Sequence, residues 1–121
     1  MTDHHNDTVA VVDDDPAVLD SLRFLLEAAG YRVATYSSAV TFLADRETPP
    51  ACLILDQHMP QMTGLELAAE LHAAGPVIRI LLITALASPA VVARAAQLGI
   101  EKVLEKPLHE HDLLGFVNAH R

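Results

Sequence analysis

The feature that most constrains this chain is a regular alternation between short apolar runs and longer segments with helical periodicity. The apolar runs occupy residues 9–12, 31–36, 52–55, 77–83 and 101–104. Several are apolar at nearly every position, which is typical of strands that are covered by helices on both faces. Strands that alternate with helices in this way predict βαβ units and a parallel sheet.

The helical segments between the runs have clear start and stop residues. Asp15 before Pro16 is typical of an N-cap followed by a first helical residue, and Gly30 ends that helix. Thr63 and Glu66 have the spacing of a capping box at the start of another helix. The remaining helices are expected at about residues 38–45, from Thr63 to Gly75, from Ser88 to Gly99, and from His109 to the C-terminus.

This order of elements predicts an α/β fold of the (βα)5 type, a doubly wound, five-stranded parallel sheet. The flavodoxin-like strand order 2-1-3-4-5 is expected, and ligands then bind beyond the carboxyl ends of the strands, where the order reverses. That point lies between the first and third strands. We expect residues 8–121 to form this single domain and residues 1–7 to form a mobile tail, since 121 residues suit one domain.

The composition argues against several classes of protein. A formal net charge of −8 makes the chain a poor direct binder of nucleic acid, because affinity for phosphates comes largely from Lys and Arg. No apolar run approaches the ~18 residues of a membrane span, and residues 1–7 are too polar for a signal peptide, so we expect a cytoplasmic protein. The single cysteine, Cys52, has apolar neighbours and is interpreted as a small buried hydrophobe.

Polar side chains stand at the carboxyl ends of four predicted strands. They are Asp13, Asp14 and Asp15 after the first strand, Asp56 after the third, Thr84 after the fourth and Lys106 after the fifth. The strand order makes these four strands consecutive neighbours, so the residues are expected to converge on one patch. Taken singly, each has an ordinary explanation, and we assign Asp15 to its helix cap. The convergence is what indicates a functional site.

The chemistry of such a patch is restricted. Carboxylates this close together repel one another, so either some take up protons or a cation lies among them. A site of carboxylates, one carbonyl and waters suits Mg²⁺. A carboxylate beside that metal can act as a nucleophile toward a phosphoryl donor and form an acyl phosphate. The transferred oxygens then need counter-charge, for which Mg²⁺, Lys106 and the Thr84 hydroxyl are available.

Four segments of the chain together resemble a known family, the receiver domains of two-component response regulators. The segments are Val-Val-Asp-Asp-Asp-Pro at residues 11–16, Leu-Asp-Gln-His-Met-Pro at 55–60 with Met-Thr-Gly-Leu-Glu-Leu at 62–67, Ile-Thr-Ala at 83–85, and Glu-Lys-Pro at 105–107. The resemblance runs from about Val9 to the C-terminus. The segments around Asp56 look most like receivers that precede LuxR-type helix-turn-helix domains of transcription regulators.

The resemblance implies a phosphoacceptor and a metal site. Asp56 would take a phosphoryl group from a sensor histidine kinase. Mg²⁺ would be held by Asp13, Asp14, Asp56 and the backbone carbonyl of His58. The ring of His58 could contact the phosphoryl group or water, and a simple place in a surface loop explains it equally well.

The resemblance also implies a switch. Thr84 would move toward the phosphoryl group and Lys106 would pair with it, with a cis peptide bond between Lys106 and Pro107. Val103 departs from the family pattern, because Tyr or Phe usually stands three residues before the lysine. The rotating aromatic ring of the family therefore has no counterpart here.

The expected function is a signalling switch that controls an output domain or partner, in transcription regulation. It would not be an enzyme beyond self-catalysed phosphotransfer and slow autodephosphorylation. A second copy is a further expected partner, through the fourth helix, fifth strand and fifth helix. We favour a piece of a longer regulator over a stand-alone receiver.

Three other functions fit the residues less well. Loss of Asp56 or Lys106 would favour a pseudo-receiver that only binds partners, and both residues are present. A metal-dependent phosphohydrolase would have a second catalytic acid where His58 stands. A flavodoxin-type cofactor binder would have a phosphate loop rich in Ser, Thr or Gly where the aspartates follow the first strand.

Overall fold

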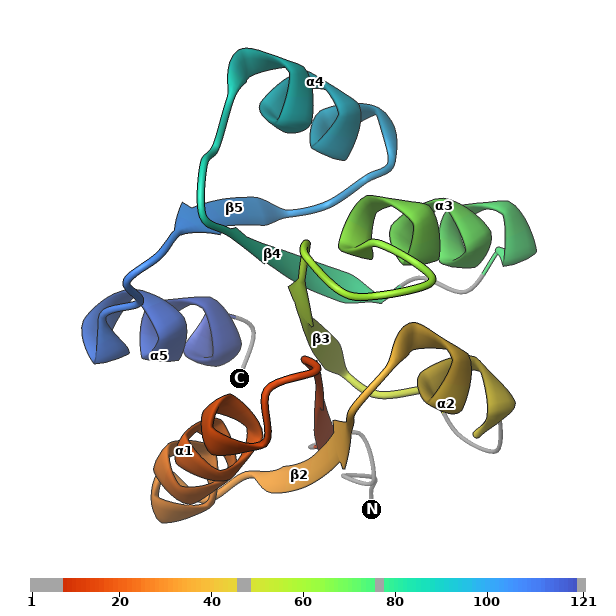
Figure 1. Ribbon diagram of the computed structural model, residues 1–121. Coiled ribbons are helices and arrows are strands. Elements are labelled where there is room, and N and C mark those ends of the chain that lie inside the picture. The colour runs from red at the N-terminus through yellow and green to blue at the C-terminus, as the bar shows by residue number, and fades with distance from the viewer. Residues whose placement is uncertain (1–7, 46–48, 76–77, 120–121) are drawn as a thin grey trace.

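The computed structural model describes residues 8–45, 49–75 and 78–119. Strands and helices alternate in the order β1 (Thr8–Val12), α1 (Pro16–Ala28), β2 (Arg32–Tyr36), α2 (Ala39–Ala44), β3 (Cys52–Asp56), α3 (Gly64–Ala74), β4 (Arg79–Thr84), α4 (Pro89–Gln97), β5 (Lys102–Glu105) and α5 (Glu110–Asn118). The strands form one parallel sheet in the order β2-β1-β3-β4-β5, as predicted (Figure 1). The predicted tail at residues 1–7, residue 77 of the fourth expected strand and the last two residues of the fifth expected helix lie outside the described ranges.

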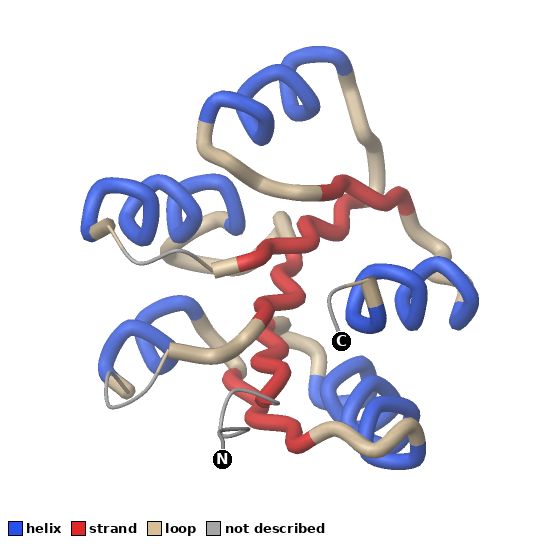
Figure 2. The backbone as a smooth tube through the Cα atoms, turned by 180° about the vertical axis from the view of Figure 1, so that it is seen from behind, coloured by secondary structure: helices blue, strands red, loops and turns tan. Residues whose placement is uncertain are grey.

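Helices cover both faces of the sheet, which is why the strands are apolar at nearly every position (Figure 2). Ala10 and Val12 pack in a core with residues of α2, α3 and α4. Val9 and Val11 point to the opposite face and pack in a second core with residues of α1 and α5. None of the helices in the described ranges has both the length and the hydrophobicity of a membrane span.

The helix caps form as the sequence indicates. The side chain of Asp15 accepts a hydrogen bond from the Ala17 amide at 2.9 Å, so Asp15 is the N-cap of α1. Thr63 and Glu66 make the predicted capping box of α3. Gly75 ends α3 in the left-handed conformation, with a φ of 102°, which glycine adopts at little cost. These local signals therefore set where the helices begin and end.

The predicted boundaries need small corrections. Tyr31 was expected in the second strand but precedes β2, because its amide donates to the Leu26 carbonyl and completes the last turn of α1. Ile78 and Glu101 also lie just before the strands predicted to contain them, since β4 begins at Arg79 and β5 at Lys102, and α5 begins one residue later than predicted, at Glu110. Apolar character marks which residues are buried, and the backbone hydrogen bonds decide where a strand starts.

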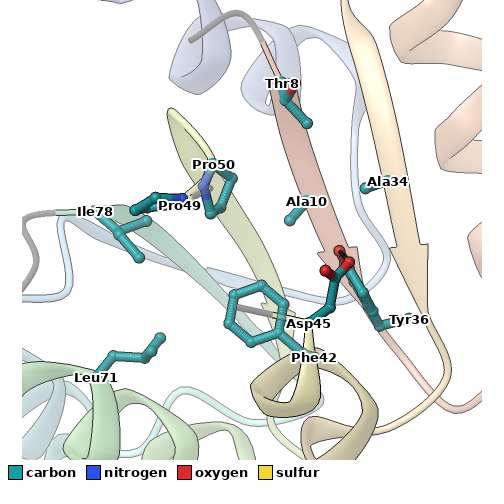
Figure 3. A pocket seen from close by; sticks show the side chains of 10 residues that line it. All are labelled: Thr8, Ala10, Ala34, Tyr36, Phe42, Asp45, Pro49, Pro50, Leu71 and Ile78. Atoms are coloured by element: carbon teal, nitrogen blue, oxygen red, sulfur yellow. Dashed lines mark hydrogen bonds between the residues drawn. The ribbon is translucent and has the colours of Figure 1, made fainter. Parts of the chain in front are cut away.

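A cavity of about 200 Å³ lies between the sheet, α2 and α3 (Figure 3). It is lined by Thr8, Ala10, Ala34, Tyr36, Phe42, Asp45, Pro49, Pro50, Leu71 and Ile78. The Tyr36 hydroxyl donates to Asp45 Oδ2 at 2.7 Å, and the Tyr36 and Phe42 rings meet edge to face with 5.2 Å between centroids. Burial, together with the hydrogen bond to Asp45, raises the pKa of Tyr36 to about 12. Asp45, the one charged residue among those that line this cavity, is thus already hydrogen-bonded to Tyr36.

Candidate functional site

The carboxyl ends of four strands bring the predicted polar residues to one edge of the sheet. Asp13 follows β1, Asp56 ends β3, Thr84 ends β4 and Lys106 follows β5. Asp13, Asp56 and Thr84 are only 3%, 2% and 1% exposed, whereas Asp14 is exposed to solvent. A buried carboxylate is costly unless a charge or a proton compensates it. This edge of the sheet therefore holds polar groups whose presence the packing of the core does not explain.

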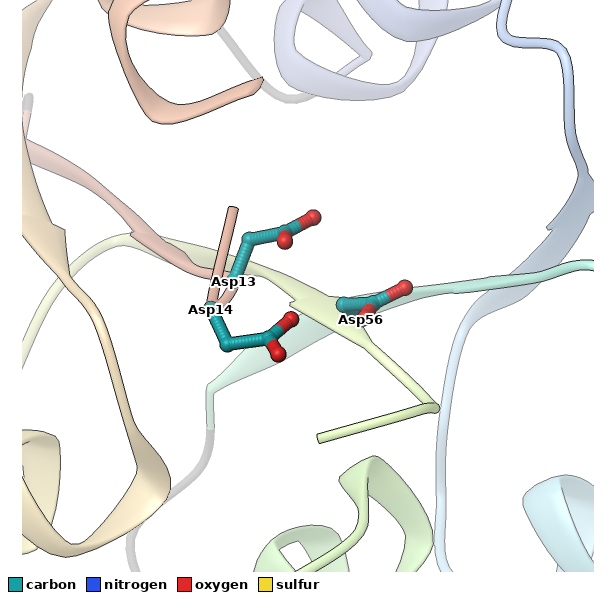
Figure 4. A group of neighbouring side chains, drawn as sticks. All are labelled: Asp13, Asp14 and Asp56. Carbon is teal, nitrogen blue, oxygen red and sulfur yellow. The ribbon is translucent and has the colours of Figure 1, made fainter. Parts of the chain in front are cut away.

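Three carboxylates form an acidic cluster at this edge (Figure 4). The ligand oxygens of Asp13, Asp14 and Asp56 all lie within 4.8 Å of one another. Burial is the main cause of a raised pKa at Asp13, and the charge of Asp56 adds to it. The Asp15 amide, which donates to Asp13 Oδ1 at 2.9 Å, and the charge of Lys106 lower that pKa in part. Repulsion among the carboxylates therefore makes the fully ionised cluster electrostatically unfavourable unless positive charge compensates it.

Lys106 supplies one positive charge to the cluster. Its Nζ lies 3.0 Å from Asp56 Oδ1, and the Asp56 carboxylate raises the pKa of Lys106. The contact is an ion pair without hydrogen-bond geometry, since the buried Oδ1 of Asp56 accepts no hydrogen bond from any described residue. One ammonium cannot neutralise three carboxylates. This donor set, with a buried oxygen that lacks a hydrogen bond, fits a hard divalent cation such as Mg²⁺.

Backbone contacts join β4 to the segment that carries Lys106. The Lys106 amide donates to the Thr84 carbonyl at 2.9 Å, and the Lys106–Pro107 peptide bond is cis, as expected. The Thr84 hydroxyl donates to the carbonyl of Leu86 at 3.3 Å, so it is held by the loop that follows β4. Val103 lies in β5 and is half-buried against the core on the side of α2, α3 and α4. An aliphatic side chain thus stands where the resemblance implies an aromatic ring.

Gln57, in the loop after β3, and Gly64, the first residue of α3, support the site, and the sequence assigned neither of them a role. A Cβ atom on Gly64 would lie 2.6 Å from the carbonyl oxygen of Asp56, so only glycine lets α3 begin this close to the end of β3. Gln57 accepts hydrogen bonds from the Gly64 amide at its carbonyl and from the Leu65 amide at its side chain. His58 lies exposed in the same loop. A small residue inside the motif was the only signal for Gly64.

The buried thiol and the acidic cap take no part in this site. Cys52 is 3% exposed, and burial raises the pKa of its thiol to about 11. The thiol therefore stays protonated and packs as a small apolar side chain of the core. Asp15 is occupied as the N-cap of α1. Both sequence interpretations are confirmed, and they leave the acidic cluster, Lys106 and Thr84 as the groups available for chemistry.

Known proteins share both the sequence and the fold of this chain. Residues 9–118 match the response regulator receiver domain family. The chain is 38% identical over 120 residues to the response regulator protein TmoT of Ectopseudomonas mendocina, covering 96% of this chain and 54% of that protein. It is 38% identical over 113 residues to the transcriptional regulatory protein FixJ of Azorhizobium caulinodans, covering 92% of this chain and 53% of that protein.

The chain thus spans about half the length of these curated relatives. A crystal structure of FixJ-N superposes with a TM-score of 0.82 at 30% identity, covering all of this chain and 98% of that one. The strand order of the sheet and the family match over residues 9–118 lead to the same assignment. The chain therefore belongs to the response regulator receiver domain family, whose members are phosphoacceptor switches of two-component systems.

Proposed function

We propose that Asp56 accepts a phosphoryl group from a sensor histidine kinase in a Mg²⁺-dependent reaction. The observation that carries this proposal is the buried Asp56 carboxylate, which lies 3.0 Å from the Lys106 ammonium and within 4.8 Å of two further carboxylates. Proteins of this family interact with such kinases, which supports the choice of donor. The domain, residues 8–121, would act in the cytoplasm, in keeping with the family.

The acidic cluster and one carbonyl are the proposed metal ligands. Asp13, Asp14 and Asp56 would hold Mg²⁺ together with the backbone carbonyl of His58. The bound cation would supply positive charge beside the phosphoryl oxygens. Asp14, which is exposed, offers the ligand that solvent can reach, whereas Asp13 and Asp56 are buried. This arrangement leaves the outer side of the site open to a phosphoryl donor.

The transfer itself uses three side chains of this chain. A carboxylate oxygen of Asp56 forms a bond to phosphorus while the bond from phosphorus to the donor nitrogen of the kinase histidine breaks. Lys106, already beside that carboxylate, then pairs with a phosphoryl oxygen. The Thr84 hydroxyl leaves the Leu86 carbonyl and donates to another phosphoryl oxygen. Each group thus gains a charge-assisted contact that exists only in the phosphorylated state.

The experiment is intact-mass measurement after incubation with acetyl phosphate. The protein should gain the mass of one phosphoryl group with Mg²⁺ present and none in excess EDTA, and Asp56→Asn should gain none in either buffer. Asp20→Asn, which alters an exposed carboxylate of α1, is the matched control and should behave like the unaltered protein. An unchanged phosphorylated fraction in Asp56→Asn contradicts the assignment, and equal labelling in EDTA contradicts the metal dependence.

The switch should act through the backbone after β4, because Val103 has no ring to turn. A β-branched side chain such as Thr84 has few rotamers and a short reach, so its own movement reshapes little surface. Movement of residues 85–89 would carry the signal into α4 and alter affinity for an output domain or a second copy at α4, β5 and α5. The relatives named as transcriptional regulators support transcription as the output.

Backbone NMR with beryllofluoride, a phosphoryl mimic, tests this route. Amide shifts from Thr84 to Leu98 should change strongly, and sedimentation should show whether the fraction of dimer rises. Large changes elsewhere with none in this segment would show that another route carries the signal. No change anywhere would favour a pseudo-receiver.

A further inference from the structure

We propose that Glu105 is a positioning residue that holds the β4–α4 loop, residues 85–88, in its resting conformation. Its carboxylate accepts a hydrogen bond from the Ala87 amide at 2.7 Å, between Glu105 Oε2 and the amide nitrogen. This contact links the end of β5 to the segment that leads into α4. The inference rests on the proposed function, since the resting conformation is the one that phosphorylation of Asp56 would replace.

The loop has few other anchors. The Thr84 hydroxyl donates to the Leu86 carbonyl at 3.3 Å and lies 3.4 Å from the Leu86 amide, which are contacts within the same segment. Apart from Thr84 at the end of β4, Glu105 supplies the one side chain that hydrogen-bonds residues 85–87 among the described residues. A carboxylate acceptor at this short distance makes a charge-assisted bond, which is stronger than a neutral one. Glu105 is therefore the main external restraint on this loop.

The helix that follows depends on this restraint because it is sparsely packed. Ala95 is the one fully buried residue of α4, and most of the other residues of this helix are exposed. Figure 1 shows α4 at the upper end of the molecule, joined to the sheet by extended segments on both sides. Leu86 and Val92 are 67% and 46% exposed, so little apolar area holds this region in place. A change at its N-terminal loop can therefore shift α4 at small energetic cost.

Glu105 also stands next to the chemistry. It directly precedes Lys106, whose ammonium pairs with Asp56 and whose amide donates to the Thr84 carbonyl. The Thr84 hydroxyl and the Glu105 carboxylate hold adjacent residues of the loop, Leu86 and Ala87. If Thr84 releases Leu86 to contact a phosphoryl group, the neighbouring Ala87 amide moves away from Glu105. By linkage, removal of the Glu105 contact must then favour the phosphorylated conformation by the same factor.

The test compares Glu105→Ala with Glu105→Gln, which retains an oxygen acceptor, and with Glu70→Ala, an equivalent change at an exposed residue of α3. Two quantities are measured, namely hydrogen exchange of the Ala87 amide and affinity for beryllofluoride in Mg²⁺. Glu105→Ala should speed exchange about tenfold and tighten beryllofluoride binding by a similar factor, the range expected for one charge-assisted hydrogen bond. Without beryllofluoride, the backbone amide shifts of Glu105→Ala at residues 85–92 should lie closer than those of the unaltered protein to the values of the beryllofluoride-bound protein.

Glu105→Gln should restore both quantities to within about threefold of the unaltered protein, since a neutral acceptor retains part of the bond. Glu70→Ala should leave both unchanged. Faster exchange in Glu105→Ala with unaltered beryllofluoride affinity would overturn the inference, because Glu105 would then only brace the loop. Failure of the unaltered protein itself to bind beryllofluoride would instead refute the proposed function, and the resting role with it.

Discussion

Asp13→Asn should make the protein more stable in metal-free buffer, although it removes a proposed metal ligand. Asp13 is 3% exposed, and burial raises its pKa, which means that the folded state disfavours the charged form. Asparagine has nearly the same shape, and its Oδ1 can keep the hydrogen bond from the Asp15 amide. The substitution therefore removes charge and leaves the packing in place.

The size of the gain follows from the distances in the acidic cluster. The ligand oxygens lie no more than 4.8 Å apart, and two unit charges at that distance repel by about 3.5 kcal/mol at an effective dielectric constant of about 20. Solvent screens the pair with the exposed Asp14, so the repulsion from Asp56 dominates, and the lost attraction to Lys106 offsets part of it. A net gain of about 1–3 kcal/mol is expected, which raises Tm by roughly 3–10 °C in a domain of this size.

The assay is thermal unfolding in EDTA and in saturating Mg²⁺, with Asp20→Asn as a control at an exposed carboxylate. Because the pKa of Asp13 is raised, the unaltered protein loses stability as the pH rises through that pKa. The advantage of the variant should therefore grow from acidic to neutral pH. It should shrink or reverse in Mg²⁺, because the cation stabilises only a cluster that binds it. A variant no more stable than the unaltered protein in EDTA at neutral pH would refute the reasoning.

Two further substitutions test the supporting structure. Gly64→Ala should lower the free energy of unfolding by about 1–3 kcal/mol in urea titrations, because its Cβ would lie 2.6 Å from the Asp56 carbonyl oxygen; an unchanged midpoint would mean that α3 moves away freely. Tyr36→Phe should flatten the loss of stability at high pH. The Tyr36 hydroxyl, with its pKa raised to about 12, keeps its proton in the folded state after the unfolded chain has lost its own, so stability falls as the pH approaches 12. Parallel alkaline unfolding curves for the two proteins would contradict this account.

The fold could be predicted because its signals are local. Runs such as Cys52 to Leu55 are apolar throughout, and a strand covered on both faces needs this pattern. Caps such as Asp15 satisfy the free amides of their own helices, so neighbouring residues decide them. The predicted strand boundaries were wrong where a residue is buried but its backbone does not bond to the sheet. Tyr31 is buried as its ring predicts, yet its amide bonds to α1 and not to the sheet.

The chemical character of the site was also readable, because acidic, hydroxyl and ammonium groups follow the strands in the chain itself. Their meeting depended on strand order, and Asp56 and Lys106 come to 3.0 Å only because β3, β4 and β5 are neighbours. No pattern in the sequence could reveal the contact of Glu105 with Ala87, and only the small residue inside the motif pointed to the closeness of Gly64 to Asp56. Residue types and periodicity are properties of the chain, so the sequence determined the fold class and the candidate chemical groups. Distances, burial and the pKa shifts that follow from them arise between residues far apart in the chain, and only the tertiary structure decided those.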